Sequence, residues 1–73
     1  MPINFSEHVI EQMKERNISE KVVREVTENP QEVLNSYRGR KLRRRYINDK
    51  LLEVVTVTEG SRITIITVYY LEE

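Results

Sequence analysis

Apolar residues near the amino-terminal end of the chain recur every four positions. At about 100° per residue, this spacing places them on one face of a helix. The residues concerned are Phe5, Val9 and Met13. Ser6 can cap the free N–H groups of the first turn, and Asn17 tolerates the left-handed conformation that follows many helices. The pattern therefore predicts an amphipathic helix over residues 7–16.

A second amphipathic segment follows after a short connection. Ser19 begins it by the same capping chemistry. Its apolar stripe consists of Val22, Val23 and Val26. Asn29 precedes Pro30, and the residue before a proline is disfavoured in the helical conformation, so the segment ends there. We expect the two helices to form a hairpin.

Beyond Pro30 the residues are typical of strands rather than helices. The expected strands are residues 32–37, 41–47, 51–58 and 62–70. The last of these is the most apolar and β-branched, which is typical of a central strand. Residues 48–50 and 59–61 are turn candidates, and Gly60 supplies a positive φ. Helices followed by strands indicate the α+β class, with the helical hairpin packed on a three- to four-stranded antiparallel sheet in one domain over residues 1–73.

The composition narrows the class of protein. The 73 residues include no Cys and one His, which excludes disulfides and thiolate metal sites and argues against structural zinc. We find no glycine-rich phosphate loop, so we expect no cofactor. There is no apolar run of about 18 residues and no signal-peptide pattern, which predicts a soluble cytoplasmic protein with no membrane partner. The charged fraction of 33% is consistent with a thermophile.

The formal net charge of zero is the sum of opposed parts. Residues 37–50 carry seven Lys or Arg and one Asp, a local charge of +6. Residues 1–36 and residues 51–73 each carry a net charge of −3. Such an asymmetric distribution of charge along the chain is informative about binding partners rather than about the fold. The basic segment predicts a surface that binds a polyanion.

Alternation divides the basic strand into two faces. One face carries Lys41, Arg43, Arg45 and Ile47, and the other carries Leu42, Arg44 and Tyr46. If Leu42 and Tyr46 pack inward, Arg44 lies between them, and an edge position would let it reach solvent. The opposite face would then present an outward row of cations about 7 Å apart, close to the phosphate spacing of a nucleic-acid strand.

Arginine forks bind phosphate, and tyrosines stack on bases. The residues expected to bind nucleic acid are therefore Arg38, Arg40, Lys41, Arg43, Arg45 and Tyr46. Two other interpretations fit the same basic segment. It can be a solvated edge strand without a ligand, or it can dock on an acidic protein partner such as the tail of an antitoxin.

Several short motifs resemble those of a family of small uncharacterised prokaryotic domains. They are Phe5-Ser6-Glu7-His8-Val9, Met13-Lys14-Glu15-Arg16-Asn17-Ile18-Ser19, Val23, Glu28-Asn29-Pro30 and Ile65-Ile66-Thr67-Val68-Tyr69. The family pattern is Ser-x-His-Ala, then Arg-Gly-Ile-Ser, then Asn-Pro, a basic middle and a closing strand. The chain departs from it at Val9, where the family usually has Ala, and at Asn17, where it usually has Gly.

This family is similar to the RelE/ParE-type toxins of the barnase–EndoU–colicin–RelE-like ribonuclease fold. The resemblance implies a RelE-like α-α-β-β-β-β domain. It also implies a toxin-type, metal-independent endoribonuclease in a toxin–antitoxin-like system. The implied partners are RNA, including RNA on the ribosome, and a cognate antitoxin.

Metal-independent RNA cleavage needs a base, an acid and cations for the phosphate. His8 and Arg16 belong to the family motif, and with Gln12 they form one stripe on the first helix. Tyr69 and Tyr70 point to opposite faces of the last strand, so one packs in the core and the other can stack or act as an acid. The expected catalytic residues are His8, Arg16 and Tyr69. Alternatively, His8 and Arg16 bond the strand backbone and hold the helix in place.

A hypothesis of another class fits the same residues. The chain can be a non-catalytic module that binds nucleic acid or protein, because a single His without an evident catalytic triad provides few groups for catalysis. A chain of this length buries only about 60% of its unfolded surface, so oligomerisation is one way to support its core. A homodimer joined through sheet edges is therefore also expected as an alternative.

Overall fold

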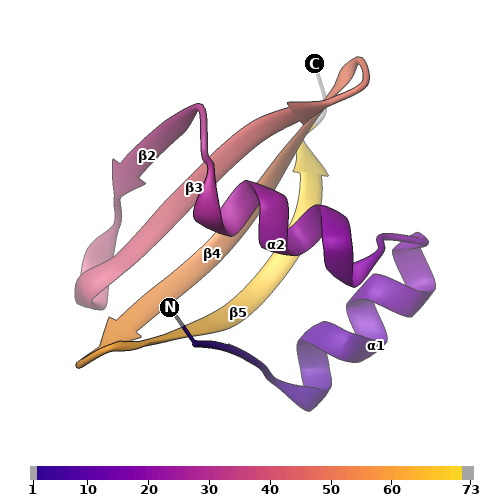
Figure 1. Ribbon diagram of the computed structural model, residues 1–73. Coiled ribbons are helices and arrows are strands. Elements are labelled where there is room, and N and C mark those ends of the chain that lie inside the picture. Colours follow the sequence, from indigo (N-terminus) through magenta and orange to yellow (C-terminus); the bar gives the residue numbers. More distant parts are fainter. Residues whose placement is uncertain (1, 72–73) are drawn as a thin grey trace.

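The computed structural model describes residues 2–71 (Figure 1). The elements in chain order are β1 (Ile3–Phe5), α1 (Glu7–Arg16), α2 (Glu20–Glu28), β2 (Glu32–Asn35), a 3-10 turn η1 (Tyr37–Gly39), β3 (Arg40–Ile47), β4 (Lys50–Glu59) and β5 (Arg62–Leu71). The class is α+β, as the order of helices and strands predicts. The helical hairpin has the expected bounds, and each predicted strand is present within a few residues of its expected ends.

Both helices begin and end as capping chemistry predicts. The Ser6 Oγ accepts a hydrogen bond from the Val9 N–H at 3.2 Å, and the Ser19 Oγ accepts one from the Val22 N–H at 3.2 Å. Asn17 ends α1 in the left-handed region, with φ of 57°. The short connection between the helices follows from these local signals.

The sheet has five strands, in the order β1-β5-β4-β3-β2, rather than the expected three to four. The additional strand is β1, which pairs parallel with β5 and makes the sheet mixed. Its three residues are too few to show a strand period in the sequence. β5 lies between β1 and β4, which agrees with its expected interior position. β3 is not an edge strand, because β2 pairs with its outer side.

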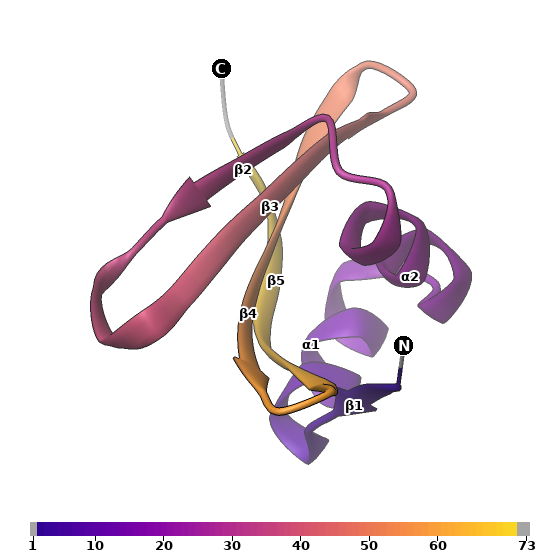
Figure 2. The same ribbon diagram turned by 60° about the vertical axis from the view of Figure 1, so that its left-hand side comes forward.

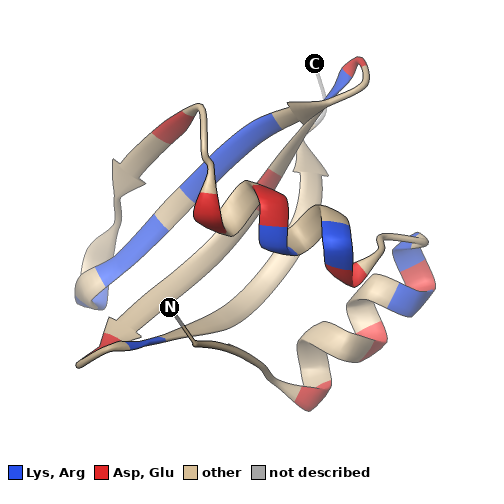
Figure 3. Cartoon of the chain, in the orientation of Figure 1, with Lys and Arg blue, Asp and Glu red and all other residues tan. Residues whose placement is uncertain are grey.

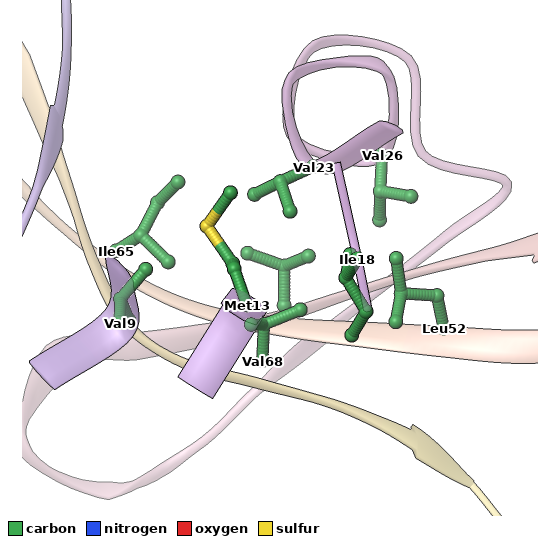
Figure 4. Close-up of a cluster of buried hydrophobic side chains, with 9 residues drawn as sticks. Val9, Met13, Ile18, Val23, Val26, Leu52, Ile65 and Val68 are labelled. Carbon is green, nitrogen blue, oxygen red and sulfur yellow. The ribbon is translucent and has the colours of Figure 1, made fainter. Parts of the chain in front are cut away.

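The two helices lie on the same face of the sheet, and the described residues leave the other face uncovered (Figure 2). We call this uncovered side the open face. The core lies between the helices and the sheet, where helical side chains meet those of β4 and β5 (Figure 4). Its buried members are Val9, Met13, Ile18, Val23, Val26, Leu52, Val54, Ile65 and Val68.

Polar side chains of α1 cover the edge of β5 beyond the end of β1. β1 pairs with β5 only as far as Ile65. The Gln12 Oε1 accepts hydrogen bonds from the Val68 N–H at 3.1 Å and the Thr67 hydroxyl at 2.8 Å. Arg16 donates to the Val68 carbonyl oxygen at 3.3 Å. These bonds give Arg16 a structural role, since they fix α1 along the strand.

Candidate nucleic-acid interface

Strand β3 presents its basic side chains to two different environments. Arg43 pairs in register with Val54 and Arg45 pairs with Leu52, and both of these partners belong to the core. The face that carries Lys41, Arg43 and Arg45 is therefore the helix side of the sheet. The predicted division of the strand into two faces is confirmed. The predicted outward direction of this row is wrong, because α2 lies over it.

Arg43 and Arg45 bond the carboxyl end of α2. Arg43 donates to the Thr27 carbonyl oxygen at 2.8 Å and to the Thr56 hydroxyl at 3.1 Å. Arg45 donates to the Asn29 carbonyl oxygen at 2.9 Å. The last turn of α2 has no basic residue of its own. Its free carbonyls and its negative dipole end favour cations from elsewhere, which explains why both arginines turn toward it.

The open face carries a row of polar residues that crosses four strands. Glu32 of β2, Arg44 of β3, Glu53 of β4 and Tyr69 of β5 are consecutive cross-strand neighbours. We call these four residues the open-face cluster. The Arg44 Nε lies 2.6 Å from the Glu53 Oε1, and the Tyr69 hydroxyl donates to the Glu53 Oε2. Arg44 also lies 3.3 Å from the Glu32 Oε1.

Glu53 is the central group of this cluster, and its side chain is only 3% exposed. A buried carboxylate is costly unless it is paired and hydrogen-bonded. Here one oxygen faces the guanidinium and the other accepts from the phenol. The hydrogen bond to Glu53 raises the pKa of Arg44. Arg44 therefore remains a cation beside the buried acid.

Tyr69 stays protonated over the whole neutral range. Burial raises the pKa of Tyr69 to about 12, and its hydrogen bond to Glu53 acts in the same direction. The phenol is therefore a hydrogen-bond donor. Tyr70 lies on the helix side and packs against the core, so Tyr69 is the tyrosine that reaches the open face.

The raised pKa of Tyr69 predicts a loss of stability at alkaline pH. The folded protein holds the phenolic proton more tightly than the unfolded chain, whose tyrosines titrate near 10.0. The contribution of the protonated Tyr69 to the stability of the folded protein is therefore complete below about pH 10. It is lost as the pH rises toward about 12. Urea unfolding measures the free energy of unfolding at about pH 8 and about pH 11. The decrease in this free energy from the lower to the higher pH should be smaller for Tyr69→Phe than for the wild type. Equal losses would contradict this prediction.

The tip of the β2–β3 hairpin is basic, and it extends away from the helices (Figures 2 and 3). Tyr37 is 74% exposed, and Arg38 and Gly39 both have φ in the left-handed region. Lys41 donates to the Asn35 side chain. Arg38 and Arg40 form no ion pair with any residue between 2 and 71. These two cations are available to a ligand.

The structure brings together only some of the residues that the sequence singled out. By strand alternation Arg40, Tyr46 and Tyr69 all lie on the open face, and the Tyr46 side chain is half exposed. His8 is exposed on the first turn of α1, on the helix side of the sheet. Arg16 bonds the β5 backbone on that same side. The structure therefore separates His8 and Arg16 from the tyrosines.

Sequence reasoning missed Glu53, although a signal for it exists. A two-residue turn at Asn48 and Asp49 pairs Ile47 with Lys50, and the same register then places Arg44 opposite Glu53. Treating residues 48–50 as a three-residue turn hides this pairing. The signal is a lone acid within the apolar residues 51–55, placed opposite an arginine by this register.

Two general properties of the described residues limit the chemistry of the site. Between residues 2 and 71, no group of three or more His, Cys, Asp or Glu side chains is placed to hold a metal ion. In the same part of the chain, no helix combines the length and the apolar character needed to cross a membrane.

The comparisons with known proteins identify one family. Residues 5–70 match the family described as a domain of unknown function, DUF4258. Neither the curated proteins nor the solved structures include a significant match to this chain. The family match spans nearly the whole sequence, including both helices and the strands of the open face. The chain therefore belongs to the DUF4258 family.

Proposed function

We propose that this chain binds RNA on the open face of its sheet and cleaves it there without a metal ion, as a toxin-type endoribonuclease related to RelE and ParE. The observation that carries the proposal is the open-face cluster. It combines a buried carboxylate, a guanidinium and a phenol within bonding contact. These are the group types that acid–base cleavage of a phosphodiester uses.

The surroundings of the cluster favour RNA as the ligand. Arg40 and Arg44 lie on the same face of β3, about 13 Å apart at roughly 3.3 Å per residue. Tyr46 is half exposed beside them and can stack on a base. The hairpin tip adds Tyr37 and Arg38 at the end of the same strand. Arginines bind phosphate while tyrosines bind bases, so the face offers both kinds of contact.

The proposed reaction is an internal transesterification. The 2′ oxygen of the substrate attacks the adjacent phosphorus, and the bond from phosphorus to the 5′ oxygen breaks. Glu53 accepts the proton of the 2′-hydroxyl, and Arg44 stabilises the charge that develops on the phosphate. Tyr69 gives its proton to the leaving 5′ oxygen, which is a far stronger base than tyrosinate. The proton that Glu53 took from the 2′-hydroxyl then passes to the Tyr69 oxygen along their hydrogen bond, so both groups return to their starting states. The products are a 2′,3′-cyclic phosphate and a 5′-hydroxyl.

A non-catalytic RNA-binding module is the second candidate, and the burial of Glu53 favours it. Both oxygens of this carboxylate already have partners, and its side chain is 3% exposed. Substrate must displace one of these contacts before Glu53 can act as a base. Binding through Arg40, Tyr46 and the hairpin tip requires no such change. Ribosome association and a cognate antitoxin remain predictions under either candidate.

RNA cleavage with EDTA present separates the two candidates. We expect the wild type to cut, Glu53→Gln to be slower by about 100-fold or more, and Tyr69→Phe to be clearly slower. Tyr70→Phe is the matched control, because the adjacent tyrosine lies on the helix side. His8→Ala should cut at the wild-type rate. Circular dichroism confirms that each variant is folded.

The outcomes distinguish the candidates as follows. RNA that is bound by the wild type but stays intact, free or on ribosomes, favours the non-catalytic module. Cleavage that depends on His8 and not on Glu53 moves the active site to the helix side of the sheet. A chain that neither binds nor cleaves RNA contradicts both candidates.

A further inference from the structure

The two edges of the sheet differ in how far their backbone is already bonded in the part of the chain that the structure describes. On the β5 side, β1 pairs with the strand, and Gln12 and Arg16 bond the backbone of Val68 beyond it. On the other side β2 is the last strand, and Val33 is 48% exposed. We propose that a second copy of this chain pairs antiparallel with β2, which joins two sheets into one. This inference is independent of the proposed function.

The backbone of β2 is arranged to accept such a strand. The Ser36 N–H donates to the Arg40 carbonyl oxygen at 2.9 Å, so this pair bonds across the β2–β3 ladder. Hydrogen-bonded pairs alternate along antiparallel strands, and Leu34 therefore bonds toward β3 as well. The N–H and C=O groups of Val33 and Asn35 point to the free edge. Unpaired groups of this kind are a template for another strand, and β2 has neither a Pro nor a Lys to block it.

The side chains of β2 suit a two-fold axis at Leu34. Antiparallel pairing about that residue places Val33 of one copy opposite Asn35 of the other, and Leu34 opposite its own counterpart. Leu34 already lies in an apolar row with Leu42 and Val55 across β3 and β4. The second copy continues this row on the open face, and no like charges meet directly across the edge.

The two ends of β2 carry opposite charges, which favours the antiparallel arrangement. Glu32 is exposed at its beginning and Glu28 is exposed at the end of the preceding α2, and the basic hairpin tip with Arg38 and Arg40 follows the end of β2 (Figure 3). Antiparallel pairing brings the acidic end of each copy toward the basic tip of the other. The two-fold axis repeats this attraction, whereas a parallel arrangement would place like charges together.

Sedimentation over a roughly hundredfold range of protein concentration tests the pairing. We expect a monomer–dimer equilibrium in the wild type. Val33→Pro removes an N–H that faces the free edge while leaving the bonds to β3, a position where edge strands tolerate proline. It should weaken the dimer by at least about tenfold. A wild type that stays monomeric, or a dimer that Val33→Pro leaves unchanged, overturns the proposal.

Disulfide trapping provides a second test that does not depend on proline. The chain contains no cysteine, so Leu34→Cys introduces a single thiol on the proposed two-fold axis. Side chains of such a directly opposed pair are close enough to bridge, and oxidation should give a covalent dimer. The matched control is Val33→Cys, which is more exposed but faces Asn35 of the second copy. Equal trapping of both variants, or trapping of neither, overturns the proposed pairing.

Discussion

Replacing Arg44 by Met should lower the free energy of unfolding by about 3 kcal/mol, because it leaves a buried carboxylate without its cation. Glu53 is 2% exposed, and its Oε1 lies 2.6 Å from the Arg44 Nε. The Arg44 side chain is itself 24% exposed, so water can partly solvate the Glu53 carboxylate once the arginine is gone. The expected loss is therefore at the low end of the range for removing one partner of a buried ion pair. Urea unfolding at neutral pH measures the change.

A double variant tests the cause. Arg44→Met combined with Glu53→Leu should recover to within about 1 kcal/mol of the wild type, because apolar residues of similar size can replace a buried ion pair. Arg24→Met is the matched control, since Arg24 pairs with Glu20 on the surface of α2. It should cost less than about 1 kcal/mol. A double variant no more stable than Arg44→Met would contradict the assignment.

Leu52→Ala should destabilise the protein by about 3 kcal/mol. Leu52 is fully buried on β4 beneath the helices, and truncating it leaves a cavity as well as removing apolar contact. A chain of 73 residues has a total stability of about 4–11 kcal/mol at 0.05–0.15 kcal/mol per residue. The variant should therefore show a markedly lower thermal midpoint, which calorimetry measures.

The adjacent residue supplies the comparison. Leu51 is also a leucine of β4, like Leu52, but it lies on the open face and is half-buried. Leu51→Ala should cost about 1 kcal/mol, since it leaves less of a cavity. Comparable losses in the two variants would contradict the assignment of Leu52, and not Leu51, to the core.

Local signals predicted the helices, whereas the arrangement of the sheet depended on distant partners. Ser6, Asn17 and Ser19 mark helix ends through bonds within a few residues, and those ends are confirmed. β1 is recognisable only through its pairing with β5, some sixty residues away in the chain. No period can develop in Ile3–Phe5, so the fifth strand could not be predicted from its own residues.

The orientation of the two faces of β3 shows why the candidate site was predicted only in part. Alternation correctly separated Arg43 and Arg45 from Arg44, but it could not say which face meets the helices. The outward row of cations was expected only if Leu42 and Tyr46 pack inward, and that arrangement leaves the cost of burying Arg44 between them. The carbonyls at the end of α2 favour the opposite orientation, since they supply hydrogen-bond acceptors for Arg43 and Arg45 on the helix side. Such acceptors become visible only when the helix is docked.

These same bonds influence the order in which the protein folds. α2 has nine residues, which is too short for an isolated helix to be stable in water. The carbonyls of Thr27 and Asn29 receive their donors from Arg43 and Arg45, and β3 holds these arginines in place once it pairs with β4. The β3–β4 hairpin is local and can form early. We therefore expect the carboxyl half of α2 to become stable only after this hairpin has formed, which gives the basic segment a role in folding as well as at the surface.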